Sequence, residues 1–458
     1  MIAYSPTRRA WLSLPILAAA AVLAPTIAAA ATAAAPEIEI KAELDRSALQ
    51  AGENQRAYLR IVIGAARRPE ARRAPMNVAL VIDRSGSMAS QGRMENARRA
   101  AQMAVDRLGR DDILSVVSYD DRVEVEVPAT KVTDAYRIKD KIGRLTPRGS
   151  TAIHAGLLAG AEEVRKFKSK DRVNRIILLS DGLANVGPSK PSDFVSLGRE
   201  LASEGLTVST IGLGTGFNED LMAGLARSAD GGHVFVQESA DLANFLAKEF
   251  DDALGIVGQQ VEIIITLKDG VKPMRSLGRD AEIKDNRIIY RVGALFGGAE
   301  QVLLSELNVG SHSPASARDI ASIEVAYVDT ASGGQRSVSA SAKASFEADR
   351  QASERSINPE VMKDVVTLQS RAARQEAINL RDAGKTEEAK RKFEQNADYV
   401  RAQQKALPAA AAYAPLVEEL KANEAAAATA TQGGEAWSKA RKAQRATDSN
   451  KAGASIKY

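Results

Sequence analysis

Oxygen-bearing side chains gather at three places in this sequence, each at the end of an apolar run or the start of a predicted helix. The first is DRSGSM, which follows the apolar run NVALVI. The second is GST in PRGSTAIHAGL, and the third is SDG in RIILLSDGLANVG. The candidate functional residues in these segments are Asp83, Ser85, Ser87, Thr151 and Asp181. Such groups can act as a nucleophile, hold phosphate or a metal ion, or simply cap a helix.

The sequence disfavours the catalytic and phosphate-binding uses. A nucleophilic serine needs a nearby base, usually a histidine that a third group orients. His154 lies about one turn into the helix predicted after Thr151, but no orienting group is evident. A metal-assisted hydrolase with His154 as its base therefore ranks third among our hypotheses. The P-loop pattern is absent, and GLGTGF (212–217) does not have the spacing G-x-G-x-x-G. We expect no enzymatic activity.

A hard metal ion suits these side chains better. Hydroxyl and carboxylate oxygens without His or Cys favour Mg²⁺, with Mn²⁺ or Ca²⁺ as alternatives. The two aspartates and three neutral hydroxyls supply few anionic oxygens to a dication that prefers about six oxygen ligands. If one aspartate binds through water, the ion keeps an open position for a partner's Glu or Asp carboxylate. The simpler alternative is that the first loop only caps the helix opening near Met88.

The elements around these segments predict a doubly wound α/β fold. Short apolar runs alternate with segments of helical period over residues 76–258, as in ILSVVS, LTVSTIGL and HVFV against MENARRAAQMAVDRLG. Apolar strands between amphipathic helices indicate a mostly parallel sheet, here of about six strands, covered on both faces. The alternating VEVEV (123–127) predicts an antiparallel edge strand. Ligands of open α/β sheets bind outside the carboxyl ends of the strands, where the three segments fall.

The flanking regions have other patterns. Residues 36–75 contain short strands and a linker, and residues 259–348 contain strands without helices, which predicts a flanking β-sandwich. We expect the earlier strands to complete this sandwich, which would make the α/β domain an insertion. Residues 349–421 predict a helical hairpin, with Asn358 as a cap before Pro359. Residues 422–458 predict a disordered basic tail that could make weak contact with the envelope.

Composition narrows the class of protein further. The 458 residues contain 62 lysines and arginines against 58 aspartates and glutamates, so there is no basic excess of the kind that nucleic-acid binders show. No cysteine is present, which excludes disulfides and thiolate metal sites. Residues 1–35 have the charged, apolar and small-residue order of a signal peptide, and TRRAWL resembles a twin-arginine signal. We expect a periplasmic or secreted protein without a mature transmembrane segment; an uncleaved anchor is the alternative.

The motif DRSGSM, with GST and LLSDG further along the chain, resembles the metal-ion-dependent adhesion site of the von Willebrand factor A domain. The resemblance covers about residues 76–258 and implies that the five candidate residues hold a divalent ion. In that family the two serines and the threonine touch the metal, and the aspartates bind directly or through water. Strands on both sides of such a domain also resemble the arrangement in inter-alpha-trypsin inhibitor heavy chains, which act extracellularly as binding proteins.

The resemblance and the residues together predict a non-enzymatic, metal-dependent protein-binding or adhesion module of the cell envelope. Its ion, most simply Mg²⁺, would capture a carboxylate from a protein partner. The alternative is an envelope scaffold or assembly factor that acts through its helical tail and uses the metal site for stability.

Overall fold

The computed structural model describes residues 38–67, 74–214, 216–236, 241–407 and 413–433, and in addition 437, 440–441 and 456–457. The predicted signal peptide (1–35) lies outside the described residues, as does most of the predicted basic tail. In the described part of the chain, no helix is both long and apolar enough to cross a bilayer.

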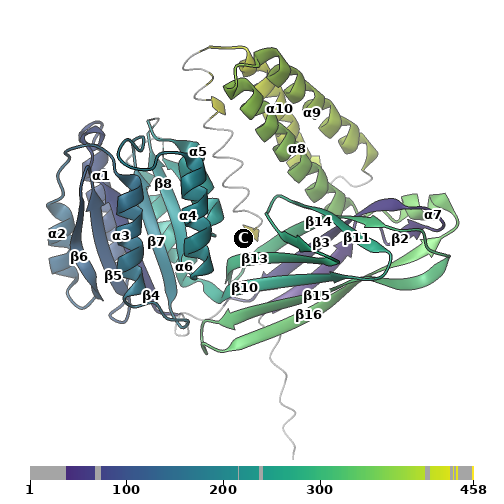
Figure 1. Ribbon diagram of the computed structural model, residues 1–458, viewed down its shortest axis with the longest axis horizontal. Helices are drawn as coiled ribbons and strands as arrows, with labels where there is room; N and C mark the ends of the chain where they lie inside the picture. The colour runs from purple at the N-terminus through teal and green to yellow at the C-terminus, as the bar shows by residue number, and fades with distance from the viewer. Residues whose placement is uncertain are drawn as a thin grey trace, which may run out of the picture. The chain divides into compact units, whose positions relative to one another are not determined.

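The α/β domain is built on a six-stranded sheet in the order β6-β5-β4-β7-β8-β9 (Figure 1). Its strands are β4 (Met76–Asp83), β5 (Ile113–Tyr119), β6 (Val123–Lys131), β7 (Val173–Ser180), β8 (Thr207–Leu213) and β9 (His233–Val236). All neighbouring strands are parallel except β5 and β6, which are antiparallel. The predicted mostly parallel sheet with an antiparallel edge strand is confirmed.

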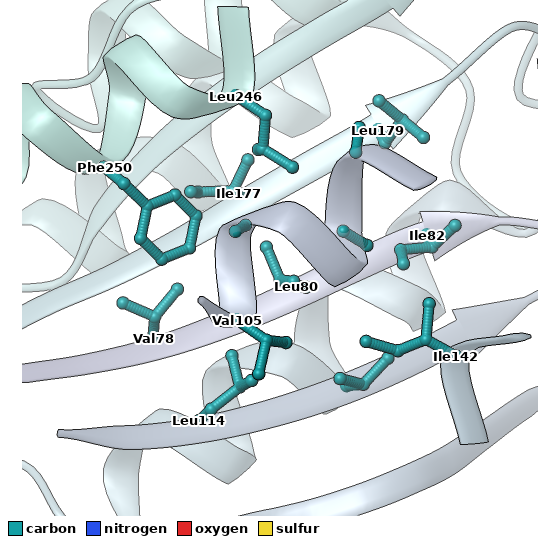
Figure 2. Close-up of a cluster of buried hydrophobic side chains, with 14 of the residues drawn as sticks. Val78, Leu80, Ile82, Val105, Leu114, Ile142, Ile177, Leu179, Leu246 and Phe250 are labelled. Carbon is teal, nitrogen blue, oxygen red and sulfur yellow. The ribbon is translucent and has the colours of Figure 1, made fainter. Parts of the chain in front are cut away.

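Helices cover both faces of this sheet, which explains why its central strands are buried at nearly every position. One face packs against α1 (Arg93–Val105), α2 (Ala135–Gly143) and α6 (Leu242–Leu254). The other packs against α3 (Ile153–Arg165), α4 (Pro191–Ser203) and α5 (Glu219–Ser228). Successive residues of β4 point to opposite faces. Figure 2 shows Val78, Leu80 and Ile82 of β4 directed toward the first face, where they meet Val105 of α1 and Phe250 of α6.

Two further sheets share a second hydrophobic core, as expected for a β-sandwich. The first contains β1 (Ile38–Leu44), β3 (Gln55–Ala65), β14 (Glu300–Val309), β11 (Val271–Leu277) and the two-residue β17 (Ile456–Lys457). The second contains β12 (Glu282–Lys284), β13 (Arg287–Phe296), β10 (Ile256–Leu267), β15 (Ala315–Asp329), β16 (Gln335–Glu347) and β2 (Ala48–Gln50). Strand β3 precedes the α/β domain and pairs with β14, which follows it, so the α/β domain is inserted between strands of one sheet.

The C-terminal region differs from the predicted hairpin because a third long helix is present. The short α7 (Arg350–Arg355) precedes α8 (Pro359–Asp382), α9 (Thr386–Ala406) and α10 (Tyr413–Ala430). Asn358 caps α8 as predicted, with its side chain accepting from the N–H groups of Glu360 and Val361. The prediction of disorder from residue 422 onward is wrong for residues 422–430, which belong to α10. The alanine-rich end of α10 is a strong helix former, and its small side chains pack against α8 and α9.

Candidate metal centre

The carboxyl end of β4 lies between the carboxyl ends of its two neighbours. Asp83, the last residue of β4, is in register with Tyr119 of β5, and Ile82 is in register with Leu179 of β7. The first and third oxygen-rich segments follow β4 and β7 at one edge of the sheet. The second segment, which precedes α3, packs against the first at the same edge. This is the edge at which ligands bind in open α/β folds.

The first and second loops are joined through their backbones. The Gly86 N–H donates to the carbonyl of Gly149 over 3.1 Å, and the Arg148 N–H donates to the carbonyl of Arg84 over 2.7 Å. Gly149 has φ +69°, and a β-carbon there would lie 2.2 Å from an Asp121 carboxylate oxygen. The positive φ and the contact with Asp121 favour glycine at this position, and the two backbone hydrogen bonds bring the segment that contains Thr151 to the first loop.

Side chains join the first loop to the third. The Ser87 hydroxyl donates to Asp181 Oδ1 over 2.6 Å, and the Ser180 hydroxyl donates to Asp83 Oδ2 over 2.6 Å. Ser85 connects the two ends of its own loop, because its N–H donates to Asp83 Oδ1 over 2.8 Å and its hydroxyl lies 3.0 Å from that of Ser87. Four of the predicted site residues thus form one hydrogen-bonded group.

Thr151 joins this group across Gly182. A β-carbon at Gly182 would lie 3.3 Å from the Thr151 hydroxyl oxygen and 3.5 Å from the Ser87 hydroxyl oxygen, so both hydroxyls face the same glycine. Asn185 fixes the threonine by accepting from its N–H over 2.7 Å. The fold therefore brings all five predicted residues together, although their role as metal ligands stays a prediction.

The site is buried except on one side. Asp83 is 0% exposed and Asp181 is 1% exposed, whereas Ser87 is exposed to solvent. Burial raises the pKa of Asp83 to about 6 even though Ser180 and Ser85 donate to it, and the nearby charge of Asp181 adds to the rise. Among the described residues, no lysine or arginine forms an ion pair with Asp83. A divalent ion would supply the missing positive charge, so this donor set fits a hard cation.

Two arginines near the loop have different partners. Arg84 forms ion pairs with Asp120 at 2.9 Å, Glu124 at 2.8 Å and Glu126 at 3.3 Å, none of which is a predicted site residue. Arg93 instead donates to Asp181 Oδ2 over 2.7 Å. Sequence reasoning missed Arg93. Its one signal was a cation in the first turn of a helix, where the helix dipole disfavours positive charge.

The remaining candidates give no second centre. The His154 ring packs edge-on against Phe194 of α4, with centroids 5.7 Å apart, so the contact seen for this imidazole is with the apolar core. Throughout the described ranges, no cluster of three or more His, Asp or Glu side chains is suited to a metal ion. The five predicted residues at the oxygen-rich edge of the sheet therefore stay the candidate metal site.

Comparison with known proteins identifies similar chains. The von Willebrand factor type A domain family matches residues 77–249. The uncharacterized protein sll0103 of Synechocystis is 31% identical over 307 residues, which cover 65% of this chain and 72% of the relative. The inter-alpha-trypsin inhibitor heavy chain H3 of Pongo abelii is 28% identical over 176 residues, covering 36% of this chain but only 20% of the heavy chain.

Solved structures show the same fold at lower sequence identity. A von Willebrand factor type A protein from Catenulispora acidiphila superposes with a TM-score of 0.68 at 18% identity, covering 85% of this chain and 89% of that one. The ArnB paralog VWA2 from Sulfolobus acidocaldarius has a TM-score of 0.58 at 15% identity, covering 90% of this chain and 99% of that one. The likeness therefore extends beyond the α/β domain.

Proposed function

Because the chain belongs to the von Willebrand factor type A domain family, we propose that it is a protein-interaction module with a divalent ion at the oxygen-rich edge of its sheet. Members of this family are commonly metal-dependent interaction modules. The residues that would hold the ion are Asp83, Ser85, Ser87, Thr151 and Asp181. The bound ion would supply a positive charge and an open position for a glutamate or aspartate side chain of a protein partner.

The buried carboxylate of Asp83 carries this proposal. Its two oxygens accept from Ser180 and from the Ser85 N–H, and its pKa of about 6 reflects an anion held away from water. Burying an anion without a cation is costly, so folds keep such a group where a charge partner binds. The exposed Ser87 leaves one side of the group open to an ion and to a ligand.

The donor types favour Mg²⁺, with Mn²⁺ and Ca²⁺ as weaker candidates. The site offers two carboxylates and three hydroxyls, a small and hard oxygen set. Ca²⁺ usually takes six to eight oxygens and several carboxylates, more than these five residues supply. Competition among the three ions, followed by calorimetry, tests this order.

We further propose that the protein works in the cell envelope and has no enzymatic role. This location rests on the signal-peptide pattern of residues 1–35. Mass spectrometry of the mature protein tests it: an N-terminus near residue 36 supports export with cleavage, and an intact Met1 in the envelope fraction supports the anchor.

A metal-dependent capture experiment tests the proposed function. Wild type and Asp83→Asn are used to capture envelope proteins in Mg²⁺ and in EDTA. Asp112→Asn is the matched control, because Asp112 is a buried aspartate at the opposite end of β4, where it accepts from the Met76 N–H over 2.7 Å. We expect capture by wild type and Asp112→Asn in Mg²⁺ alone, and none by Asp83→Asn. Capture that persists in EDTA would contradict the proposal and favour the scaffold alternative.

A further inference from the structure

Residues of its own segment and of the loops after β7 and β8 surround the Arg93 side chain. Its guanidinium donates to Asp181 Oδ2 over 2.7 Å and to Gln91 Oε1 over 2.8 Å. It also lies against Gly214, which follows β8: a β-carbon there would be 2.8 Å from Arg93 Nη2. The side chain is 14% exposed. The fold therefore fixes the guanidinium beside a predicted metal ligand.

Arg93 occupies a position that is unfavourable for a cation, and Asp181 is the group that compensates for it. Arg93 is the first residue of α1, at the positive end of the helix dipole. A cation there is usually disfavoured, because the unpaired N–H groups of the first turn already carry partial positive charge. The ion pair with Asp181 offsets this cost, so the arginine is matched to the site and not to the helix.

Arg93 differs from its neighbour Arg84 in what neutralises it. Arg84 contacts three carboxylates outside the predicted ligand set. Among the described residues, Asp181 is the one carboxylate that pairs with Arg93. Ser87 occupies the other oxygen of Asp181, so both oxygens of this aspartate are engaged by the protein itself. A divalent ion must share the charge of Asp181 with Arg93.

We propose that Arg93 determines the ligand specificity of the site by leaving it positively charged once the ion is bound. Two carboxylates and one dication balance, and the guanidinium adds one positive charge in excess. That excess lowers the affinity for the ion and raises the affinity for an anionic ligand, which here is a carboxylate side chain of an acidic protein segment. This inference rests on the proposed function, and it identifies Arg93 as the source of the positive charge that selects the acidic ligand.

Removing the charge should move the two affinities in opposite directions. Calorimetry with Mn²⁺ alone compares wild type, R93Q and R93K, with R98Q as the control because Arg98 lies on the same helix and pairs with Glu95. We expect R93Q to bind Mn²⁺ about tenfold more tightly, ~1.4 kcal/mol, and R93K and R98Q to stay within about threefold of wild type. The Mn²⁺-loaded proteins are then titrated with N-acetylglutamate amide, which R93Q should bind about tenfold more weakly.

Two results would overturn the inference. If folded R93Q binds Mn²⁺ no more tightly than wild type, Arg93 acts only as a clamp between loops. If R93Q binds N-acetylglutamate amide as well as wild type does, its charge does not select the ligand. A wild type that fails to bind Mn²⁺, or an Asp83→Asn variant that binds it equally well, contradicts the proposed function itself and removes this inference with it.

Discussion

Ser87 and Asp181 are 94 positions apart in the chain, yet the serine hydroxyl donates to the aspartate over 2.6 Å. This bond joins the loop after β4 to the loop after β7, and the register of the two strands makes it possible. The candidate site is therefore formed by several loops at one edge of the sheet, and no single motif contains it. Changes that separate the loops should affect ion binding as much as the loss of a ligand does.

Thr151 tests whether the second loop contributes a ligand. Thr151→Ala removes a hydroxyl that faces Gly182 together with Ser87. We expect the Mn²⁺ affinity to fall about tenfold, since a buried polar contact is worth ~1–3 kcal/mol. Thr151→Ser keeps the hydroxyl and should restore most of the affinity. Equal ion binding by Thr151→Ala and wild type in calorimetry would show that the second loop supplies no ligand.

Gly149 tests the close packing of the second loop against the turn between β5 and β6. Gly149→Ala places a β-carbon on a backbone with φ +69° and 2.2 Å from Asp121 Oδ1. The backbone strain alone costs ~1 kcal/mol, and the contact adds to it. Gly187→Ala is the matched control, because Gly187 has φ +78° with nothing within 4 Å. Thermal unfolding should show a larger loss of stability for Gly149→Ala, and an equal loss at both positions would mean that Gly149 is not tightly packed against Asp121.

His233 predicts a dependence of stability on pH. Burial lowers the pKa of His233 to about 4, and its Nδ1 lies 2.8 Å from the Thr210 hydroxyl. In the unfolded chain the pKa is about 6.5, so between these values the unfolded state binds more protons. The free energy of unfolding should fall by about 3 kcal/mol as the pH drops from 6.5 to 4.

His233→Gln isolates this contribution from that of the carboxylates. Denaturant unfolding at pH 7.5 and at pH 4.5 should show a smaller loss of stability in the variant than in wild type. The same loss in both proteins would mean that His233 does not carry the effect.

Glu419 tests the third helix of the C-terminal region. Its carboxylate accepts from Arg374 over 2.8 Å and from Arg371 over 3.0 Å, and the side chains of Arg374 and Glu419 are 2% and 3% exposed. Glu419→Ala leaves buried positive charge without this carboxylate, which typically costs ~3–5 kcal/mol.

Glu424→Ala on the same helix is the control, because its ion pair with Arg401 is exposed and such pairs contribute ~0–1 kcal/mol. Hydrogen exchange should show faster opening of α10 in Glu419→Ala only. Similar exchange in both variants would indicate that α10 does not pack as described.

The sequence predicted the α/β domain well because its signals are local. The central strands contain short apolar runs such as VALVI and IILL, and VEVEV alternates as expected of an edge strand. The motif residues could be predicted to meet because parallel strands end at one edge. The family match to residues 77–249 and the similarity to the Synechocystis relative confirm the resemblance to the von Willebrand factor A family.

Two features depended on contacts that local patterns do not encode. The guanidinium of Arg93 reaches Asp181 because Gly214, far along the chain, leaves it room. The alanine-rich end of α10 resembled a low-complexity tail, since alanine is too weakly apolar to produce a clear helical stripe. It is ordered because Ala426 and Ala430 pack against Ala377 and Phe393 of the preceding helices.

The most direct test of the central claim is Mn²⁺ binding by the purified full chain, measured by calorimetry at pH 7.5. Wild type and Asp112→Asn should bind one ion per chain, and Asp83→Asn should show no binding while keeping the wild-type circular dichroism spectrum. Binding of Mn²⁺ by Asp83→Asn with wild-type affinity, or no binding by wild type, would contradict a metal centre at this edge of the sheet.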